Sequence, residues 1–141
     1  MLKKITLSLA LIVACATSSQ LLAQITFHEG GTTALYEKAE SEKKLIFIDL
    51  YASWCPPCKA MERDVFSRKD VGEFMSKSFV CAKYSVDESI GKSLANQYGV
   101  SSIPTYLIFN TDGDLVGRKM GSMSAEDFIK EMQAAIERSQ L

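Results

Sequence analysis

The chain has 141 residues, about the length of one compact domain, which leaves no room for a second full domain beside the first. Hydrophobic residues make up 47% and charged residues 23%, a composition that excludes collagen-like, disordered and multi-span membrane proteins. The 16 Lys and Arg nearly balance the 17 Asp and Glu, so charge gives no reason to expect nucleic acid as a partner.

The first 23 residues have the layout of a secretory signal peptide. Two lysines precede a run of about ten mostly apolar residues, and the sequence then turns polar. The run is shorter than the roughly 20 residues of a transmembrane helix. Cleavage after Ala23 would release residues 24–141 into the bacterial periplasm. The alternative is a lipoprotein box ending at Cys15, whose lipid would tether the domain to a membrane.

Residues 24–141 are predicted to form one α/β domain of order βαβαβαββα. The expected strands are 25–28, 45–51, 79–86, 105–109 and 115–120, and the expected helices are 34–43, 55–66, 67–76, 89–97 and 125–138. The strand at 45–51 is apolar almost throughout, so we expect cover on both faces. The prediction is a mixed sheet, parallel in part and closed by an antiparallel hairpin, with helices on both faces.

Several helix ends carry recognisable signals. Thr33 and Ser67 can cap the N-termini of the helices that follow them. Ser124 begins a segment that resembles a capping box and ends at Asp127. Gly99 is expected to end the helix at 89–97.

Two cysteines, Cys55 and Cys58, follow the central strand directly and open a helix. Thiols separated by two residues at a helix start can close a disulfide with little backbone movement. At the N-cap, Cys55 would face free amides and the positive end of the helix dipole, which favour the nucleophilic thiolate. We expect Cys58, one turn deeper, to be less exposed and to act as the resolving thiol. The alternatives are a structural disulfide or half a zinc site, but no second Cys or His pair is available to complete four ligands.

With its surroundings, the cysteine pair resembles the active site of the thioredoxin family. The residues that carry the resemblance occur in the family's order and approximate spacing: Asp49, Trp54, Cys55, Pro57, Cys58, Lys59, Lys83, Asp87, Ile103, Pro104, Thr105 and Gly121. The similarity covers nearly all of residues 25–138 and implies a thioredoxin-like fold.

The resemblance also implies roles for the residues near the cysteines. Cys55 and Cys58 would form a redox-active disulfide. Asp49 would be a buried carboxylate that takes a proton from Cys58 through water. Burial should raise the pKa of Asp49, and Lys83 should oppose that rise.

A second group of residues is implied to bind substrate. The Ile103–Pro104 peptide bond would be cis and face the disulfide, so that the backbone of Ile103, Pro104 and Thr105 receives an extended substrate segment. Trp54 and Gly121 would line the groove. The resemblance implies neither a metal nor an organic cofactor.

Three features depart from cytosolic thioredoxins. Pro56 replaces a usual Gly, and the two consecutive prolines leave the Cys58 N–H as the nearest backbone donor to Cys55. The segment 61–78 is more similar to the C-terminal domain of the bacterial transmembrane thiol:disulfide interchange protein. Cys81 falls on a buried strand where the family has an apolar residue, and we interpret it as a packing residue.

The sequence therefore predicts a thiol:disulfide oxidoreductase that reduces or exchanges disulfides. Its expected partners are disulfide-containing exported proteins and a membrane-bound thiol electron donor, with the protein itself a monomer. Two alternatives stay open: a net oxidant or isomerase, and a non-catalytic metal carrier or redox-gated binding module.

Overall fold

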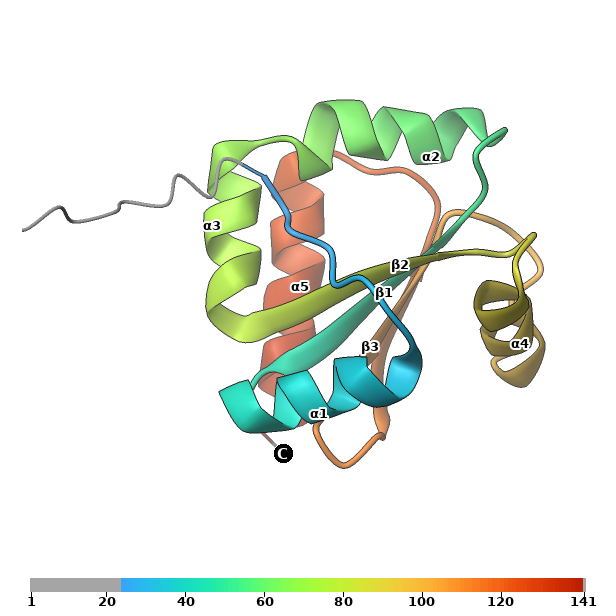
Figure 1. The fold of residues 1–141 in the computed structure, drawn as a ribbon. Coiled ribbons are helices and arrows are strands. Elements are labelled where there is room, and N and C mark those ends of the chain that lie inside the picture. Colours follow the sequence, from blue (N-terminus) through green and yellow to red (C-terminus); the bar gives the residue numbers. More distant parts are fainter. Residues whose placement is uncertain (1–23, 141) are drawn as a thin grey trace, which may run out of the picture.

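A computed structural model describes residues 24–140. The elements in chain order are α1 (Thr32–Glu42), β1 (Leu45–Tyr51), α2 (Pro56–Met61), the π-helical turn η1 (Glu62–Phe66), α3 (Lys69–Ser78), β2 (Phe79–Ser85), α4 (Ser89–Gln97), β3 (Thr105–Phe109), β4 (Leu115–Met120) and α5 (Ala125–Ser139). Helices cover both faces of one central sheet (Figure 1). The mixed α/β architecture expected from the sequence is confirmed.

The four strands lie in the order β2-β1-β3-β4. The central strand β1 pairs in parallel with β2, and Asp49 lies opposite Lys83 in that register. It pairs antiparallel with β3, where Asp49 lies opposite Tyr106. Strands β3 and β4 form the antiparallel hairpin. Asp49 therefore lies on an interior strand, with a titratable residue opposite it on each neighbouring strand.

Side chains alternate between two hydrophobic cores, as the period of a strand requires. From β1, Ile46 and Ile48 pack in the core under α1 and α4. Phe47 packs on the other face with η1, α3 and α5. Asp49 follows Phe47 by two residues and shares its face, which places the carboxyl group on the side of α2 and η1.

Two of the expected N-caps are wrong. Thr33 lies inside α1, whose N-cap is Gly31. Arg68 rather than Ser67 is the N-cap of α3, because the Ser67 hydroxyl donates backward to the Arg63 carbonyl at 2.6 Å. The expected helix at 55–66 is also divided, since its second half has π-helical rather than α-helical hydrogen bonds.

Two other helix ends confirm the prediction. The Ser124 hydroxyl accepts a hydrogen bond from the Asp127 N–H at 3.1 Å and caps α5. Gly99 follows α4 with φ of +59°, a left-handed conformation that glycine adopts without strain.

The expected strand at 25–28 is reduced to one bridge, between Phe27 and Cys81 of β2. Upstream of this bridge the chain leaves the sheet, because the Ile25 N–H donates to the Phe66 carbonyl at 2.9 Å. Gln24 then lies against Gly72 of α3, where an added Cβ would come within 2.6 Å of the Gln24 backbone. We call residues 24–28 the strap; it is part of the blue segment that leads from beside α3 to α1 (Figure 1).

The predicted signal peptide, residues 1–23 with Cys15, lies outside the described residues. Within residues 24–140, no helix combines the length and the apolar character needed to span a membrane.

Candidate active site

Cys55 and Cys58 form a disulfide at the start of α2, with their Cα atoms 5.3 Å apart. Cys55 is the N-cap, and the two prolines occupy the first two helical positions, where a missing N–H breaks no hydrogen bond. The Cys58 N–H donates to the Cys55 Sγ at 3.3 Å, as expected from the loss of the two proline donors. This amide and the helix N-terminus both stabilise negative charge on the Cys55 sulfur.

The expectation that Cys58 is the less exposed cysteine is wrong. Cys55 is 2% exposed and Cys58 is 4% exposed, because Tyr51, Val86 and Ile103 pack over the pair. Burial therefore does not distinguish the two thiols. The distinction lies in the N-cap position, which gives Cys55 alone the Cys58 amide.

The segment before β3 covers the disulfide. The Cys55 Sγ lies 3.9 Å from the Ile103 carbonyl oxygen, and the Ile103–Pro104 peptide bond is cis. The Pro104 carbonyl accepts the Gly121 N–H at 2.8 Å. The structure thus brings Ile103, Pro104 and Gly121 to the side of the cysteines.

Trp54 projects into solvent beside the buried disulfide, with 65% of its surface exposed. Its indole N–H donates to the Asp87 carboxylate at 2.8 Å, which limits the rotation of the ring. Met120, next to Gly121, is 54% exposed. An apolar rim of this kind suits contact with a protein surface better than contact with a small hydrophilic ligand.

Asp49 is buried, at 2% exposure. Burial raises the pKa of its carboxyl group to about 7, Lys83 opposes the rise, and Glu62 adds to it. A carboxyl group with a pKa near neutrality can both accept and release a proton at physiological pH. This is the property required of the proton acceptor that the sequence predicted at this position.

Lys83 carries the cation next to this carboxyl group. Its ammonium forms an ion pair with Glu62 of η1 and lies 4.9 Å from the ring centroid of Tyr51 and 5.5 Å from that of Phe27. Sequence reasoning did not single out Glu62 or Phe27. Glu62 follows Cys58 by four residues, one helical turn, and this spacing was an available signal. Phe27 carried no local signal, since only the tertiary fold brings it here.

Tyr106 shares the buried layer with Asp49. Among the described residues, neither the Tyr106 hydroxyl nor the Asp49 Oδ1 atom has a hydrogen-bond partner. Burial, and to a smaller extent Asp49, raise the pKa of Tyr106, so this phenol stays neutral at physiological pH.

The structure separates Cys81 and Lys59 from this chemistry. Cys81 is 4% exposed in the core that contains Phe79 and Met75. Burial raises the pKa of its thiol, which keeps it protonated and unreactive. Lys59 is exposed on α2.

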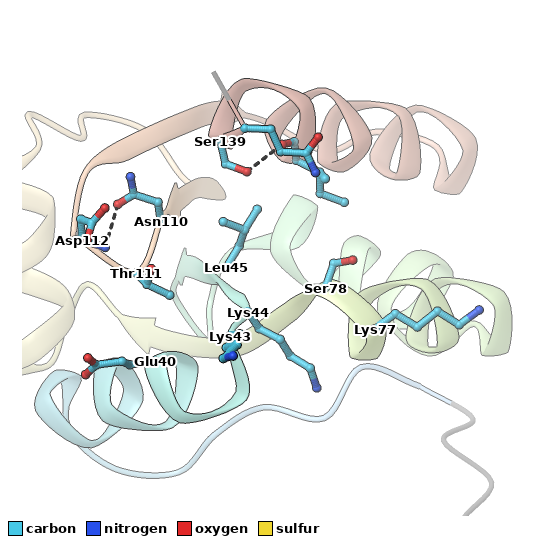
Figure 2. A pocket seen from close by; sticks show the side chains of 12 residues that line it. Glu40, Lys43, Lys44, Leu45, Lys77, Ser78, Asn110, Thr111, Asp112 and Ser139 are labelled. Atoms are coloured by element: carbon cyan, nitrogen blue, oxygen red, sulfur yellow. Dashed lines mark hydrogen bonds between the residues drawn. The ribbon is translucent and has the colours of Figure 1, made fainter.

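A pocket of about 410 Å³ lies at the opposite end of the sheet. It is lined by residues such as Lys43, Lys44, Asn110 and Asp112, where β1 begins and β3 ends (Figure 2). It contains none of the predicted site residues. The cysteine pair lies instead where β1 ends, beside the exposed Trp54.

Comparisons with known proteins bear on this site. A sequence model described as the thioredoxin-like domain matches residues 33–136. Thioredoxin H4 of Arabidopsis thaliana is 37% identical over 90 residues, which cover 64% of this chain and 71% of that protein. The thiol:disulfide interchange protein DsbD of Tatumella citrea is 30% identical over 122 residues, or 83% of this chain. The chain matches only 21% of the length of that protein.

A solved structure is also similar to this chain. The solution structure of a candidate disulphide-isomerase from Bacteroides thetaiotaomicron superimposes with a TM-score of 0.74 at 32% sequence identity. The match covers 82% of this chain and 95% of that one.

Proposed function

This chain belongs to the thioredoxin family of thiol:disulfide oxidoreductases, and we propose that it reduces or exchanges disulfides in exported proteins through Cys55 and Cys58. The observation that carries the proposal is the N-cap position of Cys55 with the Cys58 amide on its sulfur. That geometry stabilises a thiolate, and the thiolate is the form that attacks a disulfide.

In the first step, the Cys55 thiolate attacks one sulfur of the substrate disulfide. A mixed disulfide forms, and the second substrate sulfur leaves as a thiolate. Cys58 then transfers its proton to Asp49 through water and attacks the Cys55 sulfur. The Cys55–Cys58 disulfide forms, the first substrate sulfur leaves as a thiolate, and two electrons have passed from the protein to the substrate.

The substrate segment lies along the rim of the disulfide. Trp54, Ile103, Pro104 and Gly121 provide the contact surface, and the Trp54 ring packs against apolar side chains next to the substrate cysteine. Thr105 has a different role because it is fully buried. Its hydroxyl donates to the Ser102 carbonyl at 2.7 Å, so it supports the turn before Pro104 rather than touching substrate.

The setting is the bacterial periplasm, reached through the signal peptide at residues 1–23 or, as a lipoprotein, through Cys15. The electron donor is a membrane-bound dithiol protein, and the protein works as a monomer without an organic cofactor. The similarity to DsbD, named as a thiol:disulfide interchange protein, supports a thiol-based partner. Net oxidation or isomerisation is a second candidate, favoured by the similarity to the candidate disulphide-isomerase.

Reduction of insulin disulfides by the full chain, with dithiothreitol as donor, tests the proposal. Cys55→Ser should abolish the activity, Cys81→Ala should retain it, and Cys58→Ala should accumulate mixed disulfides in cell extracts. Undiminished activity of the Cys55→Ser variant would contradict the mechanism. The reduction potential of the Cys55–Cys58 pair shows whether the protein reduces or oxidises its substrates. A potential of about −270 mV indicates a reductant, and one of about −120 mV indicates an oxidant.

A further inference from the structure

The strap contributes an aromatic side chain to the surroundings of the proton acceptor. The Phe27 ring centroid lies 5.5 Å from the Lys83 Nζ, within the range of a cation–π contact. The strap lies outside the match to the family model, which begins at residue 33.

The position of Phe27 is defined by contacts on both sides of it. Backbone hydrogen bonds hold its neighbours, from the Ile25 N–H to the Phe66 carbonyl at 2.9 Å and from the His28 N–H to the Cys81 carbonyl at 2.7 Å. The Phe27 ring packs edge-on against Phe66, with centroids 5.8 Å apart. The ring is thus a fixed part of the fold.

Lys83 depends on such contacts for its position. Its side chain is 33% exposed, so the ammonium could otherwise turn toward water. The described contacts that hold it are the Glu62 carboxylate and the rings of Tyr51 and Phe27. Its effect on Asp49 acts through space, because the two groups share no hydrogen bond within residues 24–140. A through-space effect falls as the distance between the charges grows.

We propose that Phe27 is a positioning residue for the proton acceptor: its ring keeps the Lys83 ammonium close to Asp49 and thereby sets the proton affinity of that carboxyl group. The inference rests on the proposed role of Asp49 in deprotonating Cys58. Phe27 itself touches neither the sulfurs nor the substrate.

The sign of the effect follows from the groups that face Asp49. Lys83 from β2 lowers its pKa, Glu62 from η1 raises it, and Tyr106 from β3 is a neutral phenol at physiological pH. Loss of the Phe27 ring frees the ammonium to move away and weakens the lowering effect. An apolar replacement of similar size keeps water out, so the burial that raises the pKa is retained.

The experiment follows the carboxyl carbon of Asp49 by NMR across pH 5 to 9 in the full chain, oxidised and reduced. Phe27→Leu and Phe27→Met remove the ring and keep the apolar volume. In both, we expect the midpoint to rise by about half a pH unit, or about threefold tighter proton binding. Phe27→Tyr retains the ring and should retain the midpoint.

Phe74→Leu is the matched control. Phe74 packs against Phe79, with ring centroids 6.5 Å apart, and is not among the groups that contact Lys83. It should lose stability comparable to Phe27→Leu and leave the Asp49 midpoint unchanged. An unchanged or lower midpoint in both ring-free Phe27 variants, or an equal shift in the Phe74 variant, overturns the inference. The Asp49 midpoint tests the role of Phe27, and insulin reduction tests the proposed function. Either measurement can fail while the other succeeds, so the two failures are distinguishable.

Discussion

Asp49 and Lys83 lie opposite each other in the parallel register of β1 and β2, yet the lysine forms its ion pair with Glu62 of η1. The carboxyl group is left buried without direct neutralisation, and burial raises its pKa to about 7. A buried acid of this kind is available for proton transfer, and it should be costly for stability once it ionises.

Asp49→Asn should stabilise the protein at neutral and alkaline pH. The folded-state pKa of about 7 lies above the ordinary value of 3.8 for an aspartic acid. Between about pH 4 and pH 7 the folded state holds a proton that the unfolded state has released, so the unfolding free energy falls as pH rises through this window. The variant lacks this fall and should be more stable at pH 8 by up to roughly 4 kcal/mol.

Urea unfolding from pH 4.5 to pH 8 measures this difference. Asp112→Asn, at the opposite end of the sheet, is the control and should keep the pH dependence of the unmodified chain. If the unfolding free energies of the Asp49 variant and the unmodified chain changed with pH in parallel, ionisation of Asp49 would not destabilise the folded protein, and the prediction would be wrong.

Glu62→Gln should lower the pKa of Asp49. Glu62 raises that pKa by its negative charge, and the neutral amide of Gln removes this charge. The Asp49 midpoint in an NMR titration should therefore fall, with the pH dependence of insulin reduction moving in the same direction. Glu73→Gln, which breaks the exposed pair with Lys69, should leave the midpoint where it was. A rise on substitution of Glu62 would reverse the electrostatic argument.

Cys81 should be chemically silent in the folded protein. Its thiol is buried and its pKa is raised, so iodoacetamide should modify Cys55 in the reduced protein well before Cys81. Unfolding in urea should remove this difference. Cys81→Ala should retain insulin reduction at a cost of about 1 kcal/mol in unfolding free energy, from the small cavity it leaves. Rapid labelling of native Cys81 would disprove the assignment as a packing residue.

Asp87→Ala should weaken substrate binding through Trp54. The indole N–H donates to Asp87, and its loss lets the 65% exposed ring rotate away from the rim. A hydrogen bond to a charged group contributes about 1.5 kcal/mol, so kcat/KM for insulin should fall by about tenfold. Asp114→Ala, in the distant hairpin turn, is the control. An equal loss in both variants would indicate a general effect on folding.

Much of the fold follows from local sequence patterns. The strands at β1 and β3 begin and end where the apolar runs predicted them, and β4 where the hairpin turn predicted its partner. Apolar runs and turn residues are properties of short segments. The Ser124 cap and the Gly99 terminus were predictable for the same reason. Thr33 and Ser67 failed as caps because the choice among neighbouring start residues depends on how each helix packs.

The strap is a segment whose structure could not be predicted from its local sequence. Residues 25–28 have the composition of a strand, but the chain departs from the β2 edge after one bridge because Gln24 fits against Gly72 and Ile25 enters the core. The π-helical turn at η1 buries Val65 and Phe66. Neither feature has a signal in its own sequence window.

The sequence by itself determined the chemistry: two cysteines at the start of a helix, after a buried strand, with a carboxylate in that strand. These residues are close in the chain, so their spacing suffices to bring them together. Only the tertiary structure decided how the carboxyl group is tuned, because Lys83, Glu62 and Phe27 come from separate segments. Electrostatic and aromatic contacts depend on distances of a few ångströms between such segments, and folding alone sets those distances.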